Sequence, residues 1–71
     1  MKFNDVIRAA MQSTGTLQHE LGNKLGIRQN SVSNTINRQN ITLSKFITVM
    51  RVLGYDVIVR IDGEDITLTN E

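Results

Sequence analysis

Apolar residues recur at helical spacing in four separate stretches of the first 54 residues. In the first stretch they are spaced i, i+3, i+4, i+7 and i+8, which lines one side of a surface helix. These residues are Phe3, Val6, Ile7, Ala10 and Met11. Ser13, Thr14 and Gly15 follow and are expected to end this helix. Arg8 falls on its polar face, where we expect a solvated side chain rather than a phosphate contact.

The second stretch predicts a helix that begins at Gly15 or Thr16 and runs to about Lys24. Its apolar residues repeat every four positions and are expected to face the core: Leu17, Leu21 and Leu25. Thr16 is the candidate N-cap. Gly26 follows the last apolar residue, where a helix end favours a residue that can take a left-handed conformation.

After Gly26, Ile27 fills the corner and a third helix is predicted over residues 29–38. Val32 and Ile36 form its buried pair at i, i+4, and nearly every other position is polar. Two short helices around a glycine-containing turn make a helix-turn-helix, whose second helix enters the major groove of DNA.

The fourth stretch predicts a helix with Thr42 as its N-cap and Gly54 as its left-handed end. Its buried stripe consists of Leu43, Phe46, Ile47, Met50 and Leu53. Val49 and Val52 widen this stripe, so the surface serves the core alone or also meets a partner; we favour core plus partial interface.

After Gly54 the apolar period changes from 3.6 to 2, which indicates strands. Asp62-Gly63, extended by Glu64-Asp65, is the predicted hairpin turn. A lone two-stranded hairpin is marginal in water, so either the helices or a second copy across a two-fold axis must cover it. The candidate dimer interface is Tyr55, Val57, Ile58, Val59, Ile61, Ile66 and Leu68. The predicted fold is therefore mainly α: a four-helix helix-turn-helix domain (residues 1–54) and a C-terminal two-stranded β-hairpin (residues 55–71), in one structural unit.

The chain has 71 residues and no cysteine, which fits one small domain in a reducing cytoplasm and excludes disulfides and cysteine nucleophiles. Asp5 and Arg8 interrupt the N-terminal apolar positions, so no signal peptide is expected, and no run approaches the roughly 18 apolar residues of a membrane span. His19 is the single histidine, and Asn23 stands where a zinc-protease motif needs a second. We therefore expect no enzyme, cofactor or metal site.

The net charge of +1 hides an uneven distribution. Residues 1–55 carry seven basic and two acidic side chains, a net charge of +5, whereas residues 56–71 carry one basic and five acidic, a net charge of −4. A basic N-terminal part suits a polyanion such as DNA, and an acidic tail should point away from phosphates.

The spacing of six residues resembles the Xre-type helix-turn-helix family, which includes the lambdoid phage repressors and many small bacterial regulators and antitoxins. The matching residues are Gln18, Leu21, Leu25, Gly26, Ile27 and Val32. The sequence departs from the family pattern at Gly22, where an alanine is usual, and at Thr35, where an isoleucine is common. A C-terminal hairpin also differs from the fifth helix of phage repressors and is more like short regulators that end in strands.

The outward arc of the third helix is free of apolar and acidic residues, which is unusual for a merely solvated face. Arginine can make paired hydrogen bonds to guanine, and glutamine or asparagine can do so to adenine. Because the N-terminal end of such a helix reaches deepest into the groove, we predict base contacts from Gln29 first, then Arg28, Asn30 and Ser33. The predicted phosphate contacts are Asn34, Asn37 and Arg38, with Gln18 added by the family resemblance.

These features predict a sequence-specific regulator of transcription, a homodimeric repressor that binds double-stranded DNA at an inverted repeat. The alternative is an antitoxin-like module that neutralises a toxin or docks another protein through the hairpin and fourth helix. The outward face of the third helix discriminates between them, because only DNA reading depends on it.

Overall fold

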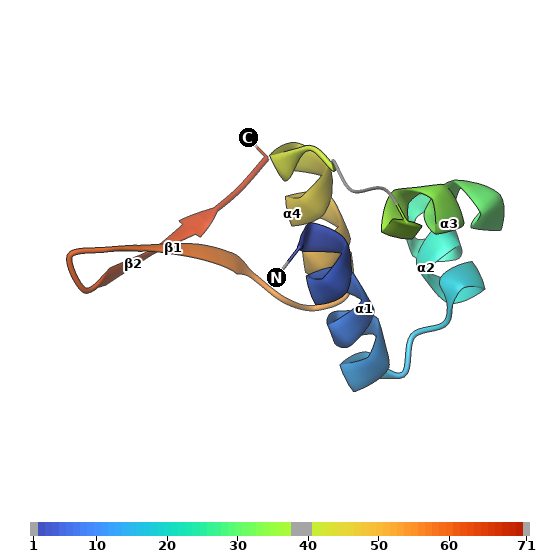
Figure 1. Cartoon of the computed structure of the whole chain (residues 1–71), viewed down its shortest axis with the longest axis horizontal. Coiled ribbons are helices and arrows are strands. Elements are labelled where there is room, and N and C mark those ends of the chain that lie inside the picture. Colours follow the sequence, from blue (N-terminus) through green and yellow to red (C-terminus); the bar gives the residue numbers. More distant parts are fainter. Residues whose placement is uncertain (1, 38–40, 71) are drawn as a thin grey trace.

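Four helices precede a two-stranded antiparallel hairpin in the computed structural model, which describes residues 2–37 and 41–70 (Figure 1). The helices are α1 (Phe3–Thr14), α2 (Gln18–Leu25), α3 (Gln29–Asn37) and α4 (Leu43–Val52). The strands are β1 (Val57–Ile61) and β2 (Glu64–Leu68). This order confirms the predicted layout of four helices and a hairpin. In the described ranges, no helix combines the length and apolar character that crossing a membrane requires.

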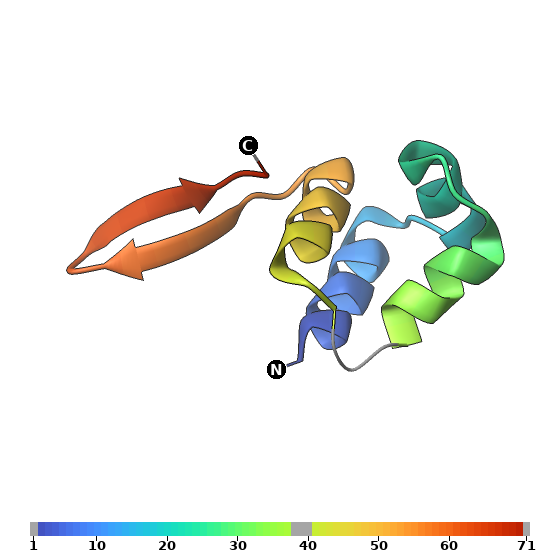
Figure 2. The same cartoon turned by 90° about the horizontal axis from the view of Figure 1, so that it is seen from above.

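The helices gather into one body, and the hairpin extends from it as an arm (Figures 1 and 2). The longest dimension is 40 Å, against 24 and 22 Å across. All four helices contribute side chains to a single core, as their apolar spacing predicts. The buried apolar residues of that core are Ile7, Ala10, Met11, Leu21, Val32, Ile36, Phe46, Val49, Met50 and Leu53.

Three residues of the predicted apolar stripes lie further out than expected. Phe3 is 41% exposed and stacks its ring on Phe46, with centroids 4.7 Å apart. Leu43, the first residue of α4, is 50% exposed. Leu17 is 59% exposed. Each of these three lies at a helix end, where periodicity alone overstates burial.

The start of α2 differs from the prediction. Thr16 is not the N-cap, because α2 begins one residue later than this cap requires and the Thr16 hydroxyl bonds to the Thr14 hydroxyl at 2.8 Å. The Thr16 N–H donates to Met11 O at 2.9 Å and completes the end of α1 around Gly15, whose φ is +67°. Leu17 is the capping residue instead. Its N–H donates to Glu20 Oε1 at 3.0 Å, and its extended backbone turns the leucine side chain out of the helical stripe.

The ends of α4 match the prediction. Thr42 Oγ1 accepts the N–H of Lys45 at 3.2 Å, so Thr42 is the N-cap. Gly54 follows the helix with a φ of +93°. The next N–H, that of Tyr55, donates back to Met50 O at 2.9 Å and fixes the direction in which the chain leaves α4.

The hairpin turn is tighter than predicted. It contains only Asp62 and Gly63, with φ of +50° and +82°, because Glu64 and Asp65 already pair with Ile61 and Arg60 in the strands. Two successive residues with positive φ are typical of the two-residue turns whose twist matches that of the strands. An ion pair of 2.7 Å from Arg60 Nε to Asp65 Oδ1 crosses the ladder and raises the pKa of Arg60 above its ordinary value.

Among the described residues, the contacts between the hairpin and the helices lie near the base of the hairpin. Val57 packs against the core, and the Asn70 side-chain amide donates to the Thr48 hydroxyl. Toward the turn, Ile61 and Ile66 are 53% and 46% exposed. The described helices therefore leave most of the hairpin uncovered.

Candidate nucleic-acid interface

A close crossing of α2 and α3 fixes how α3 is presented. A Cβ at Gly22 would stand 3.0 Å from Ile27 O and 3.2 Å from Val32 Cγ2, so only glycine fits without a shift of the neighbouring atoms. The turn that follows is closed by Gly26, whose φ of +71° favours glycine, and by the Ile27 N–H, which donates to Gly22 O at 2.9 Å. These contacts fix how closely α2 and α3 cross.

The inner side of α3 is the predicted one. Val32 and Ile36 are 1% and 3% exposed and insert between the other helices. Opposite them, the amide side chains of Gln29, Asn30 and Asn34 are exposed. The structure thus points the hydrogen-bonding groups of α3 outward, as the apolar spacing of its two buried residues requires.

Two further candidates lie at the N-terminal ends of helices. Arg28 is exposed and precedes the first residue of α3, and its carbonyl accepts the N–H groups of Ser31 and Val32 at 3.0 and 3.1 Å. Gln18 is exposed as the first residue of α2, where backbone N–H groups lack partners within the helix. Arg38 lies outside the described residues.

The C-terminal end of α3 carries a contact that the sequence analysis missed. Arg8 Nη2, from α1, donates to Asn37 Oδ1 at 2.5 Å, and Asn37 Nδ2 donates to Ser33 Oγ at 3.3 Å. Arg8 is therefore not simply a solvated residue: it brings a guanidinium to the polar face of α3. Asn37 and Ser33, predicted as DNA contacts, are engaged within the chain, although Asn37 stays exposed.

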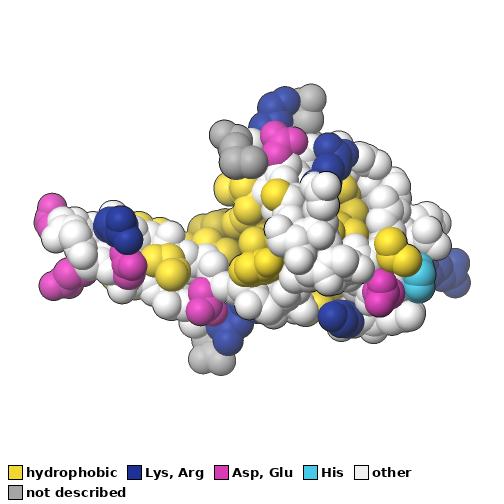
Figure 3. Space-filling model, turned by 90° about the horizontal axis from the view of Figure 1, so that it is seen from below, with side chains coloured by type: hydrophobic (Ala, Val, Ile, Leu, Met, Phe, Trp, Pro, Cys, Tyr) yellow, Lys and Arg dark blue, Asp and Glu magenta, His cyan; other side chains and the backbone are white. Residues whose placement is uncertain are grey.

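Charge is distributed over the surface as the sequence predicts. On the face drawn in Figure 3, acidic side chains concentrate along the hairpin and basic ones lie mainly on the helical body. Hydrophobic side chains run from the hairpin onto the helices on the same face. The hairpin therefore combines negative charge with exposed apolar side chains, a different surface from that of α3.

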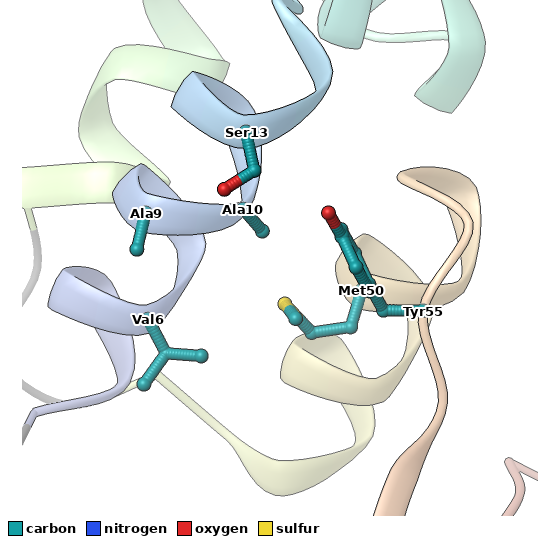
Figure 4. A pocket seen from close by; sticks show the side chains of 6 residues that line it. All are labelled: Val6, Ala9, Ala10, Ser13, Met50 and Tyr55. Carbon is teal, nitrogen blue, oxygen red and sulfur yellow. The ribbon is translucent and has the colours of Figure 1, made fainter.

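A shallow apolar cleft lies between α1 and α4 (Figure 4), with a volume of about 220 Å³. Its lining is Val6, Ala9, Ala10, Ser13, Met50 and Tyr55. Tyr55, predicted as part of the hairpin's dimer interface, packs at this cleft and is 39% exposed. In the part of the chain that the structure describes, no three histidine or acidic side chains are placed to hold a metal ion.

The six residues on which the resemblance to the Xre-type family depends lie in α2, in the turn after it and in α3. Leu21 and Val32 are buried, Gly26 is left-handed, and Leu25 and Ile27 pack against the core. No family model, curated protein or solved structure matches the chain.

Proposed function

We propose that this chain is a sequence-specific double-stranded DNA-binding protein that represses transcription as a homodimer. One observation carries the proposal: a short helix rich in amides and hydroxyls, with no acidic side chain, is held outward by the buried Val32 and Ile36. Asparagine and serine favour helices weakly, so this composition sacrifices local stability for hydrogen-bonding groups. The proposal assigns no catalysis, cofactor or metal.

In the proposed complex the N-terminal end of α3 enters the major groove. Gln29 makes the principal base contact, with Arg28 and Asn30 beside it, because these exposed residues occupy the end that reaches deepest. Ser33 reaches a base only if its hydroxyl, which accepts from Asn37, also faces the groove.

The remaining polar residues are proposed to contact the phosphate backbone. Asn34 lies further along α3, Arg38 follows that helix in the sequence, and Gln18 stands at the N-terminus of α2, where partial positive charge favours a phosphate. We add Arg8 to this group. A guanidinium has five N–H donors, and its bond to Asn37 uses one, so the others can bind phosphate while Asn37 holds the group in place.

Dimerisation places two copies of α3 in successive major grooves about 34 Å apart, which requires an inverted repeat in the DNA. The proposed interface is the exposed hairpin, with the broad surface of α4 as the other candidate. The acidic hairpin also suits this arrangement, because it keeps its charge away from the phosphates. The proposed setting is a reducing cytoplasm, which agrees with the absence of cysteine.

Selection of bound sites from random duplex DNA tests this proposal. We expect enrichment of an inverted repeat whose half-sites are centred about 10 base pairs apart. Binding to the selected site should weaken steeply between about 50 and 200 mM salt, since each neutralised phosphate releases counterions. Failure to enrich any motif, or an affinity that salt does not change, would contradict DNA reading.

The second candidate, an antitoxin-like module that neutralises a partner protein, is favoured by the exposed apolar side chains of the hairpin. Ile58, Ile61 and Ile66 are each about half exposed, which suits contact with another protein. Under this alternative, substitutions on the outward face of α3 would leave the activity intact, whereas substitutions in the hairpin would abolish it.

A further inference from the structure

We propose that the open edge of β1 pairs, antiparallel and across a two-fold axis, with β1 of a second copy, and that Ile58 is the residue opposite its own equivalent. The inference rests on the homodimer of the proposed function and specifies its edge and register. It concerns backbone pairing in the hairpin, so it can fail while DNA reading by α3 stands.

A two-stranded hairpin that faces water is only marginally stable, and this one exposes apolar side chains on both faces. Ile58 is 50% exposed on the face that carries the Arg60–Asp65 ion pair, and Val59 is 39% exposed on the opposite face. Apolar exposure on both faces cannot be removed by folding the arm against one surface. Extending the sheet sideways adds cross-strand neighbours on both faces at once.

The backbone groups available for such pairing follow from the register. Residues that flank a two-residue turn form a hydrogen-bonded pair, here Ile61 and Glu64, and the pair type then alternates along the ladder. Consequently the N–H and C=O groups of Ile58 and Arg60 point to the open edge of β1. On the other strand, those of Asp65 and Thr67 point to the open edge of β2.

The two edges differ in charge and access. β1 has the sequence VIVRI, with three β-branched residues in succession and no acidic residue. β2 carries two adjacent carboxylates, Glu64 and Asp65, and the chain beyond it is tied to α4 by the bond between Asn70 and Thr48. Two acidic strands would repel each other, so β1 is the edge suited to a second copy.

When two copies of β1 pair across a two-fold axis, one residue must lie opposite its own equivalent. The charged residues on and beside β1 determine which residue this is. With Ile58 at the axis, Asp56 faces the partner subunit's Arg60, and each copy supplies one such pair. Arg60 would then lie between Asp65 of its own chain and Asp56 of the partner subunit. Placing Val59 at the axis would instead oppose Asp56 to the partner's Asp62, and placing Arg60 there would oppose two guanidinium groups.

The same register covers the apolar side chains. Ile58 contacts Ile58 of the partner subunit, and Val57 lies opposite the partner's Val59. Tyr55 comes opposite the partner subunit's Ile61, at the lip of the cleft between α1 and α4. The partner hairpin therefore supplies apolar cover where the chain's own helices do not.

Single-cysteine cross-linking tests the register, since the natural chain has no cysteine. In the proposed register the two Ile58→Cys residues stand opposite each other as a hydrogen-bonded pair, about 5.5 Å apart at Cα, within the range that a disulfide spans. Mild oxidation of full-length Ile58→Cys should give covalent dimers at least about tenfold faster than oxidation of Val59→Cys or Thr67→Cys. Faster cross-linking of Val59→Cys would overturn the register, and faster cross-linking of Thr67→Cys would overturn the choice of edge.

A charge substitution tests the same contact without a thiol. Asp56→Lys should raise the dimer dissociation constant about tenfold or more, because two attractive pairs become repulsive. Glu64→Lys makes the same charge change on the same hairpin, but residue 64 faces no charge of the partner in this register. The dissociation constant of its dimer should therefore stay within about twofold of that of the natural chain. Equal effects of the two substitutions, or a monomeric natural chain in sedimentation, would overturn the pairing. A monomer that still selects a half-site from random DNA would leave the proposed base reading intact.

Discussion

Replacing Gln29 by alanine is expected to weaken binding at each half-site of the selected DNA by about 1–3 kcal/mol, which is up to roughly a hundredfold per half-site. The loss should be accompanied by relaxed preference at one base pair, since the side chain that distinguishes it is gone. Gln29 is exposed at the first turn of α3, so the fold should be unaffected. Titration of the duplex, with each base varied in turn at the half-site, measures both effects.

Gln12→Ala is the matched control, because it removes the same side chain from an exposed position on α1. Its affinity should stay within about twofold of the natural chain, since surface substitutions rarely change free energies by more than about 0.5 kcal/mol. Equal losses for Gln12→Ala and Gln29→Ala, or unchanged base preference in Gln29→Ala, would contradict the proposed role of Gln29.

The second large effect is on stability. Gly22→Val should lower the free energy of unfolding by about 3 kcal/mol, because its Cβ would press on the Ile27 carbonyl, which is backbone and cannot rotate away, and its methyl groups would press on Val32. Small domains have only about 5–15 kcal/mol in total. The thermal midpoint should fall by more than about 10 °C, as followed by circular dichroism.

Asn23→Val controls for placing a β-branched residue in α2, since Asn23 is the exposed neighbour of Gly22. Its effect should stay near the helix-propensity difference, well below 1 kcal/mol. If Gly22→Val and Asn23→Val unfold at the same temperature, the α2–α3 crossing can accommodate a larger side chain at position 22. That result would contradict the close crossing that is proposed to fix the position of α3.

Much of this fold could be predicted from local patterns in the sequence. The i, i+4 pair of Val32 and Ile36 was enough to orient α3, because a helix with two buried positions has only one way to turn its polar face. The adjacent Asp62 and Gly63, set between alternating apolar residues, likewise predicted the hairpin.

Two features could not be predicted from local sequence patterns: the residue at which α2 begins, and the residue of another helix that Arg8 contacts. Thr16 suits an N-cap, yet its hydroxyl bonds to that of Thr14, and α2 begins one residue later than this cap would require. Arg8 and Asn37 are 29 positions apart and meet only because α1 packs across the end of α3. A helical period places Arg8 on the polar side of α1 but does not say which helix that side reaches.

The central claim is that the outward amides of α3 touch bases, and nuclear Overhauser effects from labelled glutamine and asparagine side chains test it most directly. In the complex with the selected duplex, we expect contacts from the side-chain amides of Gln29 and Asn30 to major-groove protons of one half-site. If binding instead perturbs only the hairpin and α4, and the α3 amides keep the signals of the free protein, the account is wrong.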